Sequence, residues 1–116
     1  MGVDLNLLPL ISKDYWAAHS ILVLERRRGL WPLVEGLASK PIPQPLYGHY
    51  GRDANGETRY GTVDVDPYGS PLRYTTAGEL MKIVEHESVQ DNWLNQAVWA
   101  YLARMPMDWP IVLYWH

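Results

Sequence analysis

The chain has 116 residues, 47% hydrophobic and 20% charged, a balance typical of a folded domain and unlike that of a disordered segment. It contains no cysteine, which excludes a disulfide framework, a thiolate nucleophile and a cysteine-ligated zinc site. The net charge of −3 offers no electrostatic basis for gripping nucleic acid phosphates, so nucleic acid is an unlikely partner. We expect one globular domain over residues 1–116.

The first part of the chain predicts two strands. Val3–Leu10 begins with alternating polar and apolar residues, and His19–Arg26 is a short, unbroken run that suits a buried strand. No basic region precedes the apolar N-terminal residues, and the apolar runs fall short of the roughly 20 residues that a spanning helix needs. We therefore expect no membrane or secretory segment and a cytoplasmic protein.

The middle of the chain predicts a short helix, an extended connector and a hairpin. Leu30–Leu37 has apolar residues at helical spacing, and residues 39–51 carry prolines at alternate positions that favour an extended path. Asp53–Gly56 is a turn signal, after which Glu57–Asp66 is expected to form a strand. Asp66–Gly69 fits a type I turn, so we expect the following segment, 72–75, to pair back with that strand.

The last third predicts two capped helices and a final strand. Thr76 and Glu79 form a capping box that starts a helix over about 77–87. Ser88 and Asp91 give a weaker start for a second helix to about Arg104. The stripe expected to face the core of that helix is Trp93, Leu94, Ala97, Val98 and Tyr101.

Trp99 falls on the opposite side of the helical wheel from that stripe and is therefore the best candidate for an exposed anchor. Ile111–Trp115 is short and rich in β-formers, so it is expected to add a strand to the sheet of the N-terminal strands. The fold class is α+β: an antiparallel sheet of the N-terminal strands plus the C-terminal strand, packed on two helices, with a Gly/Tyr-rich hairpin.

No complete catalytic, metal or phosphate motif is present. Asp64 and Asp66 share a face of the expected strand and resemble a pair of metal ligands, but Asp66 already has a role in the turn. Glu85-His86-Glu87 lacks the second histidine of the zinc-protease helix, because position 90 is Gln90. We expect no metal and no cofactor, and a non-enzymatic role is favoured over an enzymatic one.

The aromatic composition is biased, with six Trp and eight Tyr but no Phe. Rings that carry a polar group are enriched at interfaces, so the bias indicates exposed binding residues; codon bias in a GC-rich genome is the alternative explanation. The candidate binding residues are Tyr47, Tyr50, Arg52, Tyr60, Tyr68, Tyr74 and Trp99.

The run YGTVDVDPYGSPLRYTTAGEL, with the opening MGVDLNLLPL and the closing LYWH, resembles small, mostly uncharacterised proteins of bacteriophages and prophages of Proteobacteria. The resemblance implies a phage accessory protein and transfers no functional residue.

Two functions follow as expectations. The first is non-enzymatic binding of a host macromolecule, such as a host protein of a defence or regulatory complex that is thereby inhibited. The alternative is a small-ligand module, in which Tyr or Trp stacks a nucleotide or sugar while Arg52, Arg59 or Arg73 holds its charge. The oligomeric state is left open.

Overall fold

The computed structural model describes residues 4–27, 29–52 and 58–116, with the backbone alone described at 48–52 and 58–60. The elements in chain order are β1 (Leu5–Ser12), β2 (Tyr15–Ala18), β3 (Leu22–Val23), α1 (Leu30–Glu35), β4 (Lys40–Pro41), β5 (Leu46–Arg52), β6 (Thr58–Val63), β7 (Arg73–Thr76), α2 (Ala77–Met81), α3 (Glu87–Gln90), α4 (Trp93–Ala103) and β8 (Pro110–Trp115).

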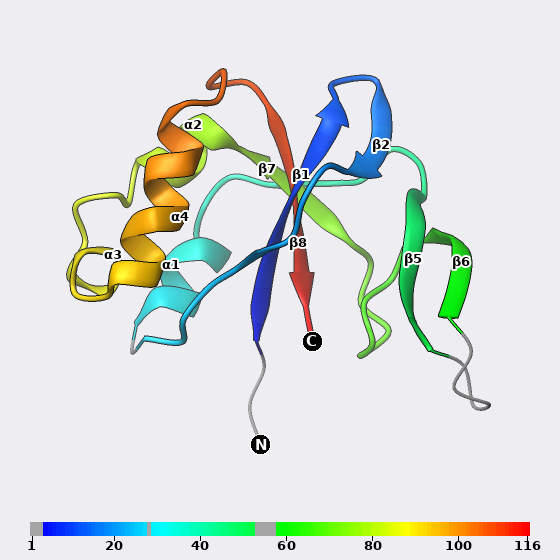
Figure 1. Ribbon diagram of the computed structural model, residues 1–116, viewed down its shortest axis with the longest axis horizontal. Helices are drawn as coiled ribbons and strands as arrows, with labels where there is room; N and C mark the ends of the chain where they lie inside the picture. The colour runs from blue at the N-terminus through cyan, green and yellow to red at the C-terminus, as the bar shows by residue number, and fades with distance from the viewer. Residues whose placement is uncertain (1–3, 28, 53–57) are drawn as a thin grey trace.

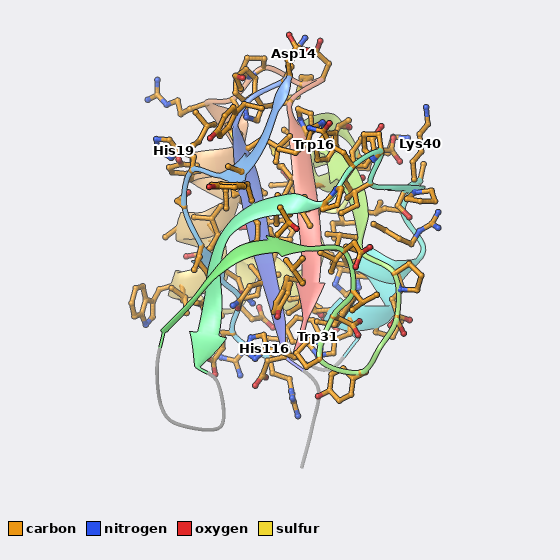
Figure 2. The ribbon with its side chains drawn as sticks, turned by 90° about the vertical axis from the view of Figure 1, so that its right-hand side faces the viewer. Asp14, Trp16, His19, Trp31, Lys40 and His116 are labelled. Carbon is orange, nitrogen blue, oxygen red and sulfur yellow. The ribbon has the colours of Figure 1, made fainter. Side chains whose placement is uncertain are left out.

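In the described part of the chain, the strands form one curled mixed sheet. Its order is β4-β7-β8-β1-β2-β5-β6, and β3 pairs with β1 beside β2. The four helices lie on one side of the central strands (Figure 1). The hairpin of β5 and β6 crosses the opposite side, in front of β1 and β8 in Figure 2. The α+β class is therefore confirmed at this coarse level.

The central pair of the sheet joins the two end strands of the fold. β1 and β8 run antiparallel with Leu5 opposite Trp115 and Pro9 opposite Ile111. The sequence predicted that the terminal strands share one sheet, but it specified neither their adjacency nor their register. Pro9 has no amide hydrogen to offer, and it lies between the stretch of β1 that pairs with β3 and the stretch that pairs with β2. Its carbonyl accepts a hydrogen bond from the His19 amide at 2.7 Å.

The alternation of side chains along β1 and β8 divides the interior into two clusters. On the helix side, Leu5 and Leu7 join Ile111 in the larger cluster, which also contains buried residues of α1, α2, α3 and α4. On the hairpin side, Leu8 and Leu10 pack with other residues in a smaller cluster, whose remaining buried members are Leu46, Leu72 and Val112. Both faces of the central strands are thus covered.

Two strand expectations are wrong. The buried strand expected at His19–Arg26 is reduced to the two residues of β3, while β2 forms just before it. The expected pairing of 72–75 with the strand before the turn occurs only at its start, where Leu72 N–H donates to the Asp64 carbonyl at 2.9 Å and Val65 bridges to Pro71. Residues 73–76 instead insert between β8 and β4. The sheet is also mixed rather than antiparallel, because β2 and β5 pair in parallel. The strands that pair with β7 and β2 are distant from them in sequence, so local sequence patterns did not specify these pairings.

Of the two predicted helix starts, the one at Thr76 is confirmed and the one at Ser88 is wrong, because Ser88 lies inside α3, which His86 caps. Thr76 Oγ1 accepts a hydrogen bond from the Glu79 amide at 3.2 Å, as the capping box requires. The Glu79 carboxylate accepts from the Ala38 amide at 3.1 Å and pairs with Lys82. The hydrogen bonds from Lys82 and Ala38 lower the pKa of Glu79. The expected helix over 77–87 ends at Met81, and Asn92 caps α4 separately from α3.

The buried face of α4 is not the expected one. Trp93 is 76% exposed, whereas Trp99 is 1% exposed and donates its indole N–H to the Leu80 carbonyl at 2.9 Å. The prediction that Trp99 is an exposed anchor is therefore wrong. The helix is rotated because Asn95 is completely buried: its side chain exchanges two hydrogen bonds with the backbone of Glu25 and donates a third to the Ser88 carbonyl.

We predict that Asn95→Ala lowers the free energy of unfolding by about 2–4 kcal/mol, because it leaves the part-buried backbone groups of Glu25 and the buried carbonyl of Ser88 without their partner. Urea unfolding followed by circular dichroism measures the change. Gln96→Ala, at the exposed neighbouring position, is the control and should change stability by less than about 1 kcal/mol. Equal losses for the two variants would show that the buried amide does not set the face of α4.

Candidate functional site

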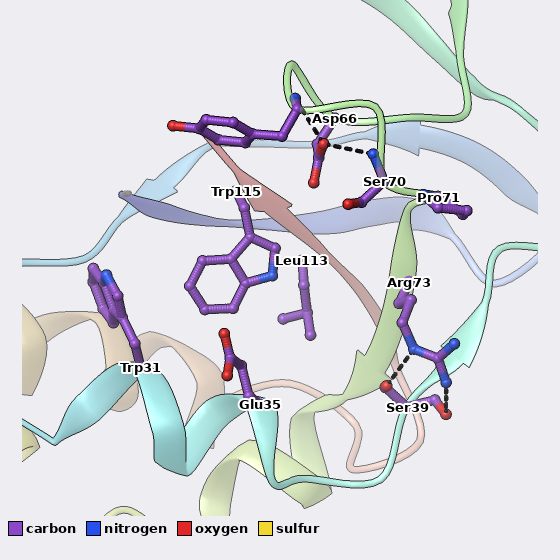
Figure 3. Close-up of a pocket in the computed structure, with 10 residues that line it drawn as sticks. Trp31, Glu35, Ser39, Asp66, Ser70, Pro71, Arg73, Leu113 and Trp115 are labelled. Carbon is purple, nitrogen blue, oxygen red and sulfur yellow. Dashed lines mark hydrogen bonds between the residues drawn. The ribbon is translucent and has the colours of Figure 1, made fainter. Parts of the chain in front are cut away.

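A pocket of about 580 Å³ opens between α1 and the turn that precedes β7 (Figure 3). The ends of β7 and β8 form its floor. Its lining comes from segments far apart in sequence: Trp31, Glu35, Ser39, Asp66, Tyr68, Ser70, Pro71, Arg73, Leu113 and Trp115. The pocket therefore exists only once the sheet has placed β8 beside β7.

One wall of the pocket consists of two tryptophans. The rings of Trp31 and Trp115 meet edge to face, with centroids 5.9 Å apart and planes inclined at 80°. Both rings are partly buried against the main hydrophobic cluster. Trp115 shares a face of β8 with Leu113, and Trp31 is carried by α1, whose preceding residue Gly29 has a φ of 86°, a conformation that favours glycine. The aromatic wall is thus anchored in the core.

The roof of the pocket is the turn Asp66–Gly69, which forms as predicted. The Gly69 amide donates to the Asp66 carbonyl at 2.9 Å, and Gly69 has a φ of 85°. Asp66 is 8% exposed, and its Oδ1 accepts hydrogen bonds from the Tyr68 and Ser70 amides at 2.8 and 3.0 Å. The other carboxylate oxygen points away from the turn, toward Leu113 in Figure 3. One oxygen holds the turn while the other faces the pocket.

Two further charged side chains line the pocket. Glu35, at the end of α1, is exposed and points its carboxylate toward the Trp115 ring (Figure 3). Arg73 donates from Nε to Ser39 Oγ and from Nη2 to the Ser39 carbonyl, both at 2.8 Å. These bonds tie the start of β7 to the segment before β4. Arg73 is therefore held at the rim by Ser39.

The negative charge of Asp66 also acts on the opposite side of the sheet. Tyr114 follows Leu113 in β8 and packs on the smaller hydrophobic cluster. Burial, and secondarily the Asp66 carboxylate, raise the pKa of the Tyr114 hydroxyl. The Tyr114 hydroxyl consequently stays protonated at neutral pH and adds no negative charge to that of Asp66.

The structure separates the residues that the sequence singled out. Tyr68 lines the pocket and Tyr47 lies on β5, and each is 59% exposed. Tyr74 is half-buried and packs edge to face on Trp16, with centroids 5.0 Å apart. Trp99 is in the core. The side chains of Tyr50, Arg52 and Tyr60 lie outside the described residues.

Sequence reasoning did not single out Trp31 and Glu35, two of the residues that line the pocket. A signal was present, because Trp31 and Glu35 are four residues apart in a predicted helix and so share one of its sides. Likewise, Leu113 and Trp115 are two residues apart in the predicted last strand and so point to the same face of it. Nothing local indicated that these two faces would meet.

The described ranges contain no group of three or more His, Asp or Glu residues placed to hold a metal ion. Asp64 is exposed, and Asp66 uses one carboxylate oxygen within its turn. Among the same residues, none of the helices has the length and apolar character required to cross a membrane.

Comparison with known proteins finds no matching family model, no matching curated protein and no matching solved structure. The comparisons do not bear on the resemblance to phage proteins, which stays a prediction. The pocket must be interpreted from its own chemistry.

We predict that Asp66→Ala lowers the free energy of unfolding by about 1–3 kcal/mol, because two turn amides lose their shared acceptor. Asp66→Asn keeps an oxygen at that position and should cost less than about 1 kcal/mol. Urea titration of the two variants and the unchanged protein measures both values. An equal loss for alanine and asparagine would mean that the charge, not the hydrogen bonds, stabilises the turn.

Proposed function

We propose that this protein is a binding module whose small ligand enters the pocket between α1 and the Asp66–Gly69 turn. The observation that carries the proposal is the pair of Trp31 and Trp115, which form one wall of a cavity of about 580 Å³. Small-molecule pockets have volumes of about 300–1,000 Å³ and combine apolar walls with a few placed polar groups. This pocket has both properties.

Two of the polar side chains of the pocket are held in place before any ligand arrives. Asp66 is fixed by the Tyr68 and Ser70 amides, and Arg73 is fixed by Ser39. Groups that are already ordered lose little conformational freedom on binding, so their interactions contribute more fully to affinity. A pre-organised pocket supports a binding role without a catalytic step.

We predict that a ligand of this pocket raises the melting temperature, because it binds the folded state and not the unfolded one. A thermal-shift screen with amines, sugars and nucleotides identifies the class. Trp31→Leu should then weaken the dissociation constant of any hit at least about tenfold, through loss of ring contact worth about 1–3 kcal/mol.

Trp93→Leu is the matched control for that screen. It also removes a tryptophan, but from the 76% exposed start of α4, outside the pocket lining. It should leave the affinity unchanged, and circular dichroism confirms that both variants are folded. If no compound of any class shifts the melting temperature, or if the two variants behave alike, the pocket is not a binding site.

A second function is favoured by the exposed aromatic side chains of Tyr47, Tyr68 and Trp93. We propose it as the role that the phage resemblance implies: a non-enzymatic accessory protein that binds a host protein in the host cytoplasm. Tyrosine and tryptophan are enriched among the residues that dominate such interfaces. Inhibition of a defence or regulatory complex is one outcome that such binding would have.

We predict that the double change Tyr47→Ser and Tyr68→Ser removes the host protein that the unchanged chain captures from a host lysate. Loss of two interface rings weakens binding by about 2 kcal/mol or more, which is enough to lose a micromolar partner in washing. Tyr101→Ser, at a 41% exposed position on α4, serves as the control. If the double variant still captures the same protein, Tyr47 and Tyr68 are not part of the binding surface.

A further inference from the structure

The pocket holds more negative than positive charge. Glu35 and Asp66 both line it, and neither forms an ion pair with any of the side chains described, those of residues 4–27, 29–47 and 61–116. Arg73 is the cation of the lining, but the two hydrogen bonds described for it both go to Ser39. Among these described side chains, neither carboxylate has a partner of opposite charge.

The burial of Asp66 makes this imbalance significant. The residue is 8% exposed, so little of it is in contact with water. The Tyr68 and Ser70 amides satisfy only Oδ1, whereas the other oxygen faces the pocket in Figure 3. A carboxylate that is taken out of water is stabilised by a positively charged hydrogen-bond donor. The second oxygen of Asp66 is placed to accept from such a donor.

The aromatic wall favours the same kind of ligand. The faces of tryptophan rings attract cations, more strongly than those of tyrosine or phenylalanine. Glu35 points toward the Trp115 ring in Figure 3, so a cation that pairs with Glu35 lies close to an aromatic surface as well. An anion in the same position would meet two carboxylates, and the negative charges would repel it.

We infer that the ligand of this pocket carries a positively charged nitrogen, as an alkylammonium or guanidinium group. The inference rests on the proposed small-ligand function and narrows it: phosphate-bearing nucleotides are disfavoured, and neutral sugars bind less well than cations. Two sources supply this chemistry, a free amine and the lysine or arginine side chain of a protein. The positive nitrogen lies between Glu35 and Asp66, and its alkyl stem packs on Trp115.

The test measures dissociation constants by calorimetry for a series of matched probes. Butylammonium and butylguanidinium are the cations, n-butanol is the neutral analogue and butyrate is the anion. Glucose and adenosine monophosphate represent the sugar and nucleotide classes. Blocked tripeptides with a central lysine, arginine or norleucine form the second arm, because norleucine keeps the alkyl stem and lacks the charge.

Three variants locate the charge dependence. Glu35→Gln and Asp66→Asn each remove one negative charge while keeping a similar shape, and Asp66→Asn retains the turn acceptor. Glu85→Gln removes a charge from an exposed position between α2 and α3 and is the control. We expect Glu35→Gln to weaken cation binding about two- to fivefold and Asp66→Asn about tenfold, because Asp66 is less screened by water. Glu85→Gln should change it less than about twofold.

The outcomes separate the inference from the function on which it rests. Tighter binding of the cations than of butanol, weakened by both pocket variants, supports the inference. A lysine or arginine peptide that exceeds the free amine then identifies a protein side chain as the source. Binding of glucose, the nucleotide or butanol that equals or exceeds cation binding overturns the inference and leaves a ligand pocket. If no probe binds, both proposals fail.

Discussion

The antiparallel pairing of β1 with β8 is the constraint on which the rest of the structure depends. Both strands are buried on both faces, with Leu5 and Leu7 toward the helices and Leu8 and Leu10 toward the β5–β6 hairpin. The register, with Leu5 opposite Trp115 and Pro9 opposite Ile111, determines which side chains of the two strands face each cluster. The helices and the hairpin then pack on faces that the central pair has already defined.

The pocket follows from that register. Leu5 lies opposite Trp115, and opposed residues of an antiparallel pair point to the same face of the sheet. Trp115 therefore lies on the helix side with Leu5, where it contacts Trp31 of α1. β7 pairs with the other side of β8, and so it carries the Asp66 turn to the same place. The aromatic wall and the carboxylates thus come from separate local segments, which the sheet brings together. None of these segments forms a binding site by itself.

Most of the features that the sequence predicted correctly have a local cause, and the placement of the terminal strands in one sheet is the exception. Asp66 and Gly69 form a turn, and Thr76 caps a helix, because neighbouring backbone groups supply their partners. The face of α4 was misjudged because periodicity counts apolar residues, whereas a polar one, Asn95, is buried to satisfy the backbone of Glu25. The pocket could not be predicted from local patterns, because Trp31 and Trp115 meet only through the tertiary fold.

The separation of β1 and β8 along the chain has a consequence for how the protein is made. β1 is synthesised long before β8, and it carries apolar side chains on both faces. Closing the long loop between the two strands is entropically costly, and it cannot begin before β8 is available. Until then, the apolar side chains of β1 lack their main partner strand and are open to contacts with other chains.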